Sequence, residues 1–169
     1  NLDAEFSFDF DAASSSPTWP GRPHIGPGGA WEDALSDRPW RELGEVAWLN
    51  PPYSKAGGGG RGILSWHERA YSSGCTVVVL CPPHPGRRWF QRYASRADEI
   101  RVFRSRLSFI NPLTGLPARN NTQDSCLIIY RPRVHSSCPR WHWIDVPPTD
   151  PVGDEHDASP APPAFGGAS

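Results

Sequence analysis

The 169-residue chain has no methionine, no internal repeat and no apolar run of membrane-spanning length. The last two absences exclude a repeat architecture and a transmembrane helix, and no signal peptide is visible. None of the four cysteines stands in a Cys-x-x-Cys pair, so Cys138 and His142 alone do not predict a zinc site. The other three lie in or beside apolar runs, and we expect them to be reduced core thiols: Cys75, Cys81 and Cys126.

Charge is distributed unevenly along the chain, although the net charge is only −1. Residues 86–144 hold eleven arginines and three acidic residues, whereas residues 145–169 hold five acidic residues and no lysine or arginine. A basic segment in an otherwise acidic chain favours a polyanionic partner. The alternative, which charge alone leaves equally open, is a solvated arginine surface.

The order of the expected elements predicts an α/β fold. Alternation in residues 5–13 predicts a strand with Asp9 and Asp11 at its carboxyl end, and a long loop rich in Pro, Gly and Ser follows over 14–29. Helical turns are expected at 30–37. Further strands are expected at 45–49, 75–81, 99–103, 106–110, 125–132 and 140–146, and helices at 62–74 and 86–97. The central order of strand, helix, strand, helix, strand predicts an α/β sandwich with a mainly parallel sheet.

The four residues "NPPY" follow the apolar run 45–49, at the carboxyl end of a strand where open α/β sheets bind ligands. The Asn50 side-chain carbonyl accepts hydrogen bonds, and Pro51 and Pro52 fix the direction of the preceding carbonyls. Tyr53 offers a flat ring for stacking. Two acceptors beside a stacking ring suit a planar heteroaromatic ring with an exocyclic amino group. The alternative is an ordinary Asn-Pro turn.

Five stretches in the same order resemble the phage-type Dam DNA N-6-adenine-methyltransferases, over roughly residues 5–131. They are "FSFDFDA" (6–12), "VAWLNPPYS" (46–54), "VVVLCP" (77–82) followed by "WF" (89–90), "ADEIRVFRSRLSF" (97–109) and "SCLIIY" (125–130). The resemblance implies a compact Rossmann-like methyltransferase sheet, mainly parallel, with flanking helices. It implies transfer of a methyl group from S-adenosylmethionine to adenine in DNA, as in restriction-modification, with the target base flipped out of the duplex. It implies no metal and a cytoplasmic location in a bacterial or phage-infected host cell.

The resemblance also assigns roles to individual residues. The amino-group contacts fall to Asn50 and Pro51 and the stacking contact to Tyr53, so that the expected catalytic residues are Asn50, Pro51, Pro52 and Tyr53. Asp9 falls on the acidic position of the first family motif, which implies a contact to the cofactor, and Asp11 is a weaker candidate for the same role. One feature departs from longer methyltransferases, because "AASSSP" replaces a Gly-x-Gly after the first strand.

The basic half of the chain is the expected contact to DNA. Arg104 and Arg106 flank an expected strand, and we expect them to contact backbone phosphates, with solvated charge as the alternative. A second expected path for DNA runs along Lys55 and Arg61 in the glycine-rich segment 55–62. We interpret that segment as a mobile lid, with a flexible linker as the alternative.

The chain divides by composition into two parts. We expect residues 1–146 to form the methyltransferase domain, truncated if residues before Asn1 are missing, and residues 147–169 to form a disordered acidic tail. Two alternative functions remain at this point. The chain could methylate RNA adenine or protein glutamine, or it could be a non-catalytic relative that binds nucleic acid through the basic half.

Overall fold

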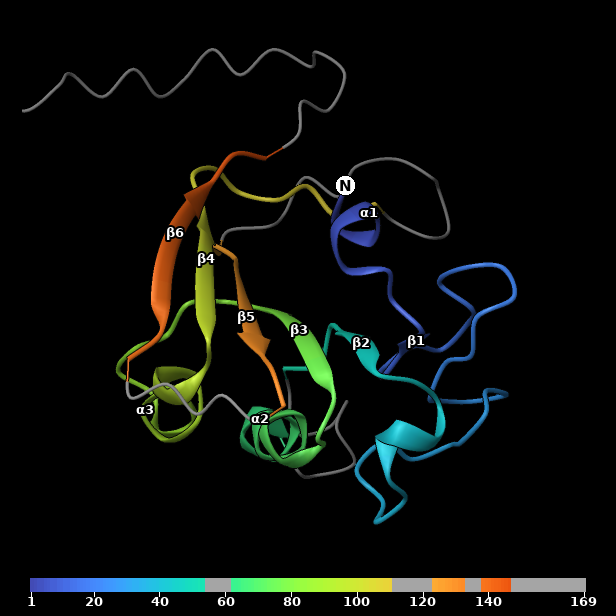
Figure 1. Ribbon diagram of the computed structural model, residues 1–169. Coiled ribbons are helices and arrows are strands. Elements are labelled where there is room, and N and C mark those ends of the chain that lie inside the picture. The colour runs from blue at the N-terminus through green and yellow to red at the C-terminus, as the bar shows by residue number, and fades with distance from the viewer. Residues whose placement is uncertain (54–61, 111–122, 133–137, 147–169) are drawn as a thin grey trace, which may run out of the picture.

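The computed structural model describes residues 1–53, 62–110, 123–132 and 138–146 (Figure 1). The strands are β1 (Phe10–Asp11), β2 (Val46–Leu49), β3 (Thr76–Cys81), β4 (Glu99–Phe103), β5 (Cys126–Tyr130) and β6 (Arg140–Ile144). The helices are α1 (Leu2–Phe6), α2 (Gly62–Ser72) and α3 (Arg88–Arg92), with 3-10 turns η1 (Trp40–Glu42) and η2 (Ala94–Arg96). The expected lid, apart from Gly62, and the expected tail lie outside the described residues.

The six strands form one sheet in the order β1-β2-β3-β5-β4-β6. β1, β2 and β3 pair in parallel, as do β4 and β6, whereas β5 runs antiparallel to both of its neighbours. The α/β class is therefore confirmed, but the sheet is mixed and not mainly parallel, and a Rossmann-like topology is not confirmed. The physical reason is that β5 lies directly beside β4, the strand before it in the chain, and antiparallel neighbours need no helical crossover between them.

Three local predictions differ from the structure, two of them because short-range hydrogen bonds decide the backbone. Residues 5–13 are not one strand: Asn1 caps a short helix by accepting from the Asp3 N–H at 3.0 Å, and Ser7 ends it with a left-handed φ of 52°. Residues 30–37 form turns, in which the Asp33 carboxylate accepts from the Leu35 N–H at 2.9 Å and so competes with a helix. Residues 106–110 belong to none of the six strands.

The sheet is buried on both faces around β3, as its uninterrupted apolar sequence predicts. Val77 and Val79 pack on the face covered by α2 and α3, together with Trp66 and Phe90. The opposite face holds a smaller cluster with Val78, Leu80, Leu127 and Ile129, against which α1 packs. Figure 1 shows α2 and α3 side by side on one side of the sheet and α1 apart from them near the N-terminus.

The cysteine prediction is confirmed for the three thiols in apolar surroundings. Cys75, Cys81 and Cys126 are buried and not disulfide-bonded, while Cys138 is exposed. Cys81 and Cys126 lie opposite each other on β3 and β5 with 3.9 Å between their sulfur atoms. None of the described helices is long and apolar enough to cross a membrane.

A fully buried histidine lies between α2 and the sheet. His67 stacks on Trp89 with 4.2 Å between ring centroids, and its Nδ1 lies 2.8 Å from the Tyr130 hydroxyl. Burial lowers the pKa of His67 to about 3, since the charged imidazolium would lose its hydration. Between about pH 6.5 and pH 3, the imidazole is therefore neutral in the folded protein but protonated in the unfolded chain.

This burial predicts a loss of stability in mild acid. Below pH 6.5 the unfolded chain takes up a proton at residue 67 that the folded chain refuses, so stability falls as the pH drops toward 3. The expected loss from this residue is about 2 kcal/mol between pH 7 and pH 5. Urea unfolding at both pH values should show a smaller loss in His67→Asn, which keeps a polar atom for Tyr130. Equal losses in both proteins would contradict the assignment.

Candidate active site

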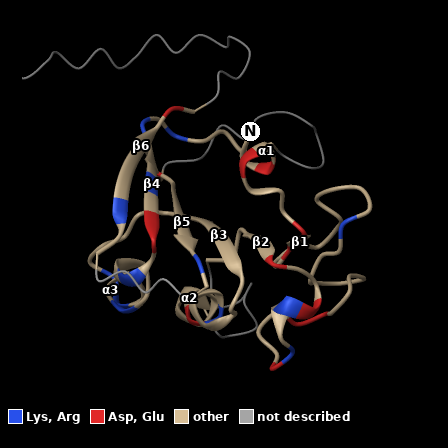
Figure 2. Cartoon of the chain, in the orientation of Figure 1, with Lys and Arg blue, Asp and Glu red and all other residues tan. Residues whose placement is uncertain are grey.

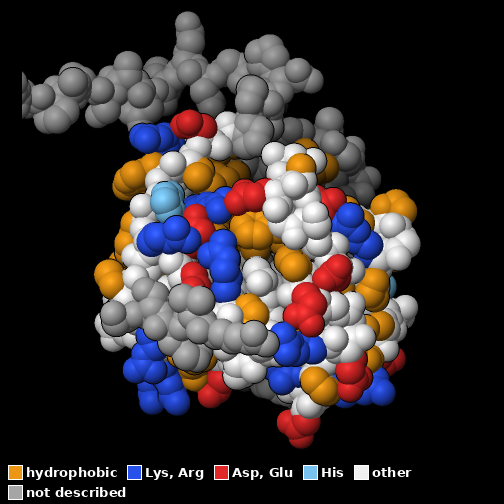
Figure 3. Space-filling view, in the orientation of Figure 1, with side chains coloured by type: hydrophobic (Ala, Val, Ile, Leu, Met, Phe, Trp, Pro, Cys, Tyr) orange, Lys and Arg blue, Asp and Glu red, His pale blue; other side chains and the backbone are white. Residues whose placement is uncertain are grey.

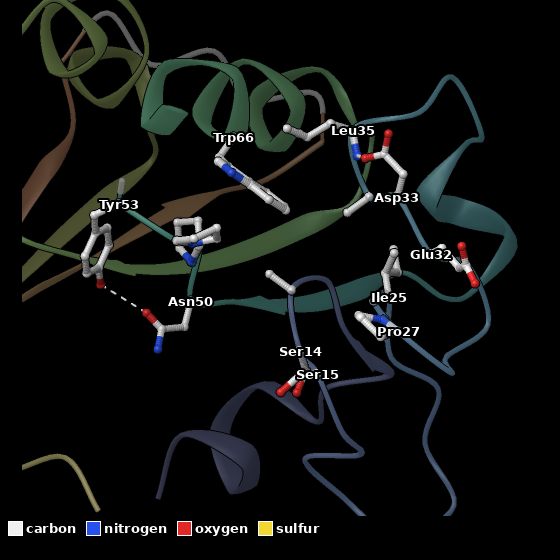
Figure 4. A pocket seen from close by; sticks show the side chains of 15 residues that line it. Ser14, Ser15, Ile25, Pro27, Glu32, Asp33, Leu35, Asn50, Tyr53 and Trp66 are labelled. Carbon is white, nitrogen blue, oxygen red and sulfur yellow. Dashed lines mark hydrogen bonds between the residues drawn. The ribbon is translucent and has the colours of Figure 1, made fainter. Parts of the chain in front are cut away.

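A cavity of about 660 Å³ lies at the carboxyl ends of β1 and β2 (Figure 4). Its walls come from the segment after β1, the segment after β2, the long loop between these strands, and α2. The residues that line it are Ala13, Ser14, Ser15, Ile25, Gly26, Pro27, Glu32, Asp33, Ala34, Leu35, Asn50, Pro51, Pro52, Tyr53 and Trp66. The cavity thus lies where the parallel strands end, which is the position at which open α/β sheets bind ligands.

Asp11 holds the first wall in place from beneath. Its carboxylate is buried at the end of β1, where it accepts from the Ala13 N–H at 3.0 Å and from the Thr18 hydroxyl. Burial raises the pKa of Asp11, although these hydrogen bonds oppose the shift. Asp11 is therefore not among the lining residues, but its carboxylate holds the backbone of Ala13, which is.

The loop between β1 and β2 lies against this wall without room for a side chain. Its chain pairs with the end of β1, and the Ser14 N–H donates to the Ile25 carbonyl at 3.1 Å. Gly26 has a φ of +147°, and a Cβ atom there would meet the Ser14 carbonyl oxygen at 2.0 Å. Glycine is thus required where the two backbones meet at the cavity.

The "NPPY" segment forms the second wall, and its tyrosine reaches two acceptors. The Tyr53 hydroxyl lies 3.0 Å from Asn50 Oδ1 and 3.1 Å from the Leu80 carbonyl oxygen at the end of β3. Figure 4 shows the Tyr53 ring beside the cavity with its hydroxyl directed at the Asn50 amide. Burial raises the pKa of the Tyr53 phenol, so the hydroxyl keeps its proton. One proton serves one acceptor at a time, so the Asn50 oxygen can give up this bond to a ligand.

Comparison with known proteins identifies the family of the chain. The sequence profile of the DNA N-6-adenine-methyltransferase (Dam) family matches residues 1–141. The chain belongs to the Dam family. It is 32% identical, over 96 residues, to a DNA N-6-adenine-methyltransferase of Haemophilus phage HP1 (strain HP1c1). The match covers 54% of this chain and 51% of that relative, so the chain spans about half the length of the curated relative it matches. No solved structure matches it.

The structure does not bring Asp9 of this Dam-family chain to the cavity. The Asp9 carboxylate lies beside the amino end of β2, where its Oδ2 accepts from the Glu45 N–H at 2.8 Å and the Val46 N–H at 3.0 Å. Asn50 is at the other end of the same strand. The side chain also packs against Gly44, where a Cβ atom would meet the Asp9 Cβ at 2.3 Å. Asp9 therefore fixes the start of β2 in this structure.

Sequence reasoning did not identify several residues that line the cavity. Trp66 of α2 is only 7% exposed, yet it forms part of the cavity wall. Glu32 and Asp33 place two carboxylates among the lining residues. The one available signal was the length of the loop that starts at residue 14, because long loops in compact domains are often functional.

Two groups of arginines in the basic half form ion pairs with acidic residues. Arg101, Arg131 and Arg140 surround the nearly buried carboxylate of Glu99, at 2.7, 3.3 and 3.8 Å. Burial alone would raise the pKa of Glu99, but the hydrogen bonds from Arg101 and Arg131 outweigh it and the pKa is lowered. Figure 2 shows basic residues along α3, β4 and β6, and Figure 3 shows charges of both signs mixed on the surface it presents. Three of the eleven arginines in residues 86–144 thus form ion pairs within the sheet.

Arg104 and Arg106 are more accessible than this group. They form ion pairs with Asp145 at 3.4 Å and Asp124 at 3.7 Å, and their side chains are 60% and 63% exposed. Such exposed pairs contribute little to stability and compete weakly with another anion. Lys55 and Arg61, the second expected path for DNA, lie outside the described residues.

We expect Asp9→Ala to lower stability by about 1–2 kcal/mol, because two backbone N–H groups of β2 lose their acceptor. The melting temperature of Asp9→Ala should fall by about 3–8 °C. The melting temperature of Asp9→Asn should stay near that of the unsubstituted chain, because its amide oxygen can accept the same hydrogen bonds. Differential scanning calorimetry measures both. An Asp9→Ala protein with an unchanged melting temperature would show that these bonds do not matter.

Proposed function

We propose that the chain transfers a methyl group from S-adenosylmethionine to the exocyclic amino group of an adenine in DNA. The observation that carries the proposal is the position of the Asn50 amide and the Tyr53 ring at the mouth of the cavity, at the end of a parallel strand. Membership of the Dam family supports the substrate and the reaction. Because the chain spans about half of its curated relative, the activity of the whole protein stays part of the proposal.

The lining of the cavity fits a cofactor with cationic groups. Glu32 and Asp33 supply carboxylates, and none of the described residues around the cavity is a lysine or arginine. Such a site attracts a sulfonium or ammonium group and does not suit a phosphate. Ile25 and Trp66 supply apolar surface of the kind that purine rings contact, and the volume lies in the usual range for ligand pockets. Bound there, the cofactor supplies a methyl group on a positively charged sulfur.

The residues of the "NPPY" segment position the acceptor nitrogen. In the proposed complex the Tyr53 proton turns to the Leu80 carbonyl, which leaves Asn50 Oδ1 to accept from the adenine amino group. The Pro51 carbonyl accepts a hydrogen bond from the second amino hydrogen, and the buried ring of Pro51 prevents this oxygen from moving away. Two acceptors in this arrangement draw the nitrogen lone pair out of conjugation with the ring. One amino proton leaves to solvent when the N–C bond has formed.

The Tyr53 ring is suited to holding a base that has left the duplex. It is 46% exposed, whereas its hydroxyl is anchored between Asn50 and Leu80. Extruding a base costs a few kcal/mol, and stacking on an aromatic ring recovers about 1–3 kcal/mol. A fixed exposed ring beside the amide therefore favours an unpaired adenine over a paired one.

We expect Asn50→Ala to lower the rate of methyl transfer about a hundredfold or more, since it removes an acceptor worth roughly 3 kcal/mol in the transition state. Cofactor affinity, measured by calorimetric titration, should change by no more than a few-fold. The rate is measured with a labelled methyl donor and unmodified DNA, followed by nucleoside analysis. Full activity in this variant would refute the site, and label found only in RNA or protein would refute the substrate.

Arg104 lies at the end of the sheet where β2 also has its carboxyl end, and this position predicts contact with DNA phosphates. It follows β4, three strand spacings or about 14 Å from the end of β2. We expect Arg104→Ala and Arg106→Ala each to weaken DNA binding and to reduce the slope of log affinity against log salt by about one unit. Cofactor affinity should not change.

Arg41→Ala is the matched control for this experiment. Arg41 is also exposed and forms an ion pair, with Glu45 at 3.0 Å. It lies near the amino end of β2, however, at the end of the strands opposite to Arg104. Fluorescence anisotropy with a short duplex at several salt concentrations gives the slopes. If all three variants share the original slope, Arg104 and Arg106 are solvated surface charges.

A further inference from the structure

The edge strand β6 carries the two most exposed tryptophans of the described chain. β6 is the last strand of the sheet, and among the described strands only β4 pairs with it. Trp141 and Trp143 are 54% and 65% exposed. Both lie on the face of the sheet that α3 covers, where Trp141 approaches Phe90 with 6.2 Å between ring centroids. Adjacent exposed indole rings on an open edge strand mark a surface that binds a partner.

The pairing with β4 determines which backbone groups of β6 point outward. The Arg140 N–H donates to the Asp98 carbonyl at 3.1 Å, and the Ile144 carbonyl accepts from the Arg104 N–H at 2.9 Å. Backbone groups alternate in direction along a strand, so residues 140, 142 and 144 bond toward β4. The N–H and C=O groups of Trp141 and Trp143 therefore point away from the sheet. The residues with exposed rings are also those with outward hydrogen-bonding groups.

We propose that β6 pairs antiparallel with β6 of a second copy of this chain. In the register that sets Trp141 opposite the partner's Trp143, and Trp143 opposite the partner's Trp141, every outward N–H and C=O of these residues finds a partner. The two-fold axis passes between the two His142 residues, which form a pair without backbone hydrogen bonds. The interface is thus self-complementary, as a two-fold dimer requires.

Neighbouring registers are poorer for identifiable reasons. If Trp141 lies opposite its own copy, Trp143 faces the partner's Pro139, which has no N–H to donate. If Trp143 lies opposite its own copy, Trp141 faces the partner's Asp145, which places a carboxylate against an indole ring. The register centred on His142 avoids both. It also gathers four tryptophan rings on one face of the joined sheet.

The size of this surface predicts a weak dimer. A tryptophan buries at most about 250 Å², so four rings at their exposed fractions offer on the order of 600 Å². Stable interfaces bury roughly 1,200 Å² or more. We therefore expect reversible dimers at high concentration, stabilised by four backbone hydrogen bonds and the ring cluster.

Disulfide trapping tests the register directly in the full chain. In a Cys138→Ser background, His142→Cys places two thiols across the axis with Cβ atoms about 4.5–5.5 Å apart. Diamide, which takes up two electrons and two protons as the S–S bond forms, should cross-link this variant into a dimer. Arg140→Cys is the matched control: the side chain is also exposed, but it faces the partner's Ile144 and lies about 13 Å from its own copy. Cross-linking of both variants alike, or of neither, overturns the register.

Sedimentation equilibrium tests the dimer without cross-linking. The original chain should show mass between monomer and dimer at about 100–200 µM, as expected for a small interface. Trp143→Pro should form less dimer than Trp143→Ser, since only proline removes an outward N–H. Neither substitution removes a hydrogen bond to β4. Ile110→Ser, at a site that is 57% exposed and belongs to none of the six strands, should dimerise like the unsubstituted chain. Thermal melts confirm that each variant is folded.

A monomer at every concentration in the unsubstituted chain overturns the proposal. If Trp141→Ser and Trp143→Ser also weaken binding of that monomer to a DNA oligonucleotide, this surface is a nucleic-acid contact instead. Because none of these measurements depends on methyl transfer, they are independent of the proposed function.

Discussion

The parallel pairing of β2 between β1 and β3 is the constraint on which the candidate active site depends. Leu49 lies opposite Val79, so the residue after β2 comes level with Leu80 near the end of β3. This register puts the Tyr53 hydroxyl within reach of the Leu80 carbonyl. A shift by one residue would turn the core side chains of β2 to the other face and remove that contact. Packing in the core and geometry in the cavity are thus specified by the same hydrogen bonds.

The long segment between β1 and β2 completes the site through backbone interactions. It returns to the end of β1 through the bridge between Asp11 and His24, and Gly26 permits the close approach to Ser14. Trp40 anchors the far end of the segment in the core, with its indole N–H donating to the Ala34 carbonyl at 2.9 Å. A segment rich in proline and glycine is in this way held as a wall rather than left as a free connection.

Electrostatics divide the basic half of the chain between structure and surface. The Glu99 carboxylate attracts Arg101, Arg131 and Arg140 across three neighbouring strands, and Glu5 adds a second acid at 2.6 Å from Arg101. These pairs engage three of the eleven arginines that residues 86–144 contain. The described lining of the cavity, by contrast, contains the acids Glu32 and Asp33 and no arginine or lysine, which gives the cavity the opposite electrostatic character.

Local sequence was sufficient for features whose physics is local. The apolar run of β3 and the spacing in α2 predicted both elements, because burial on two faces or on one helical stripe leaves a direct trace in the residue pattern. The end of β2 at Leu49 was predicted because Pro51 and Pro52 cannot continue a strand. The resemblance to the Dam family rested on the same stretches and was confirmed by the family profile.

Tertiary structure decided what depends on pairing between distant segments. The reversal of β5 leaves no trace in its own sequence, since a strand buried on both faces has the same apolar pattern in either direction. Asp9 and Asp11 are equivalent by pattern, but register sends one carboxylate to the amino end of β2 and the other beneath the cavity. The positions of Glu32 and Asp33 beside the cavity follow from a loop path that no local periodicity encodes. The sequence determined which residues end β2, and only the packing of the sheet decided which side chains meet them.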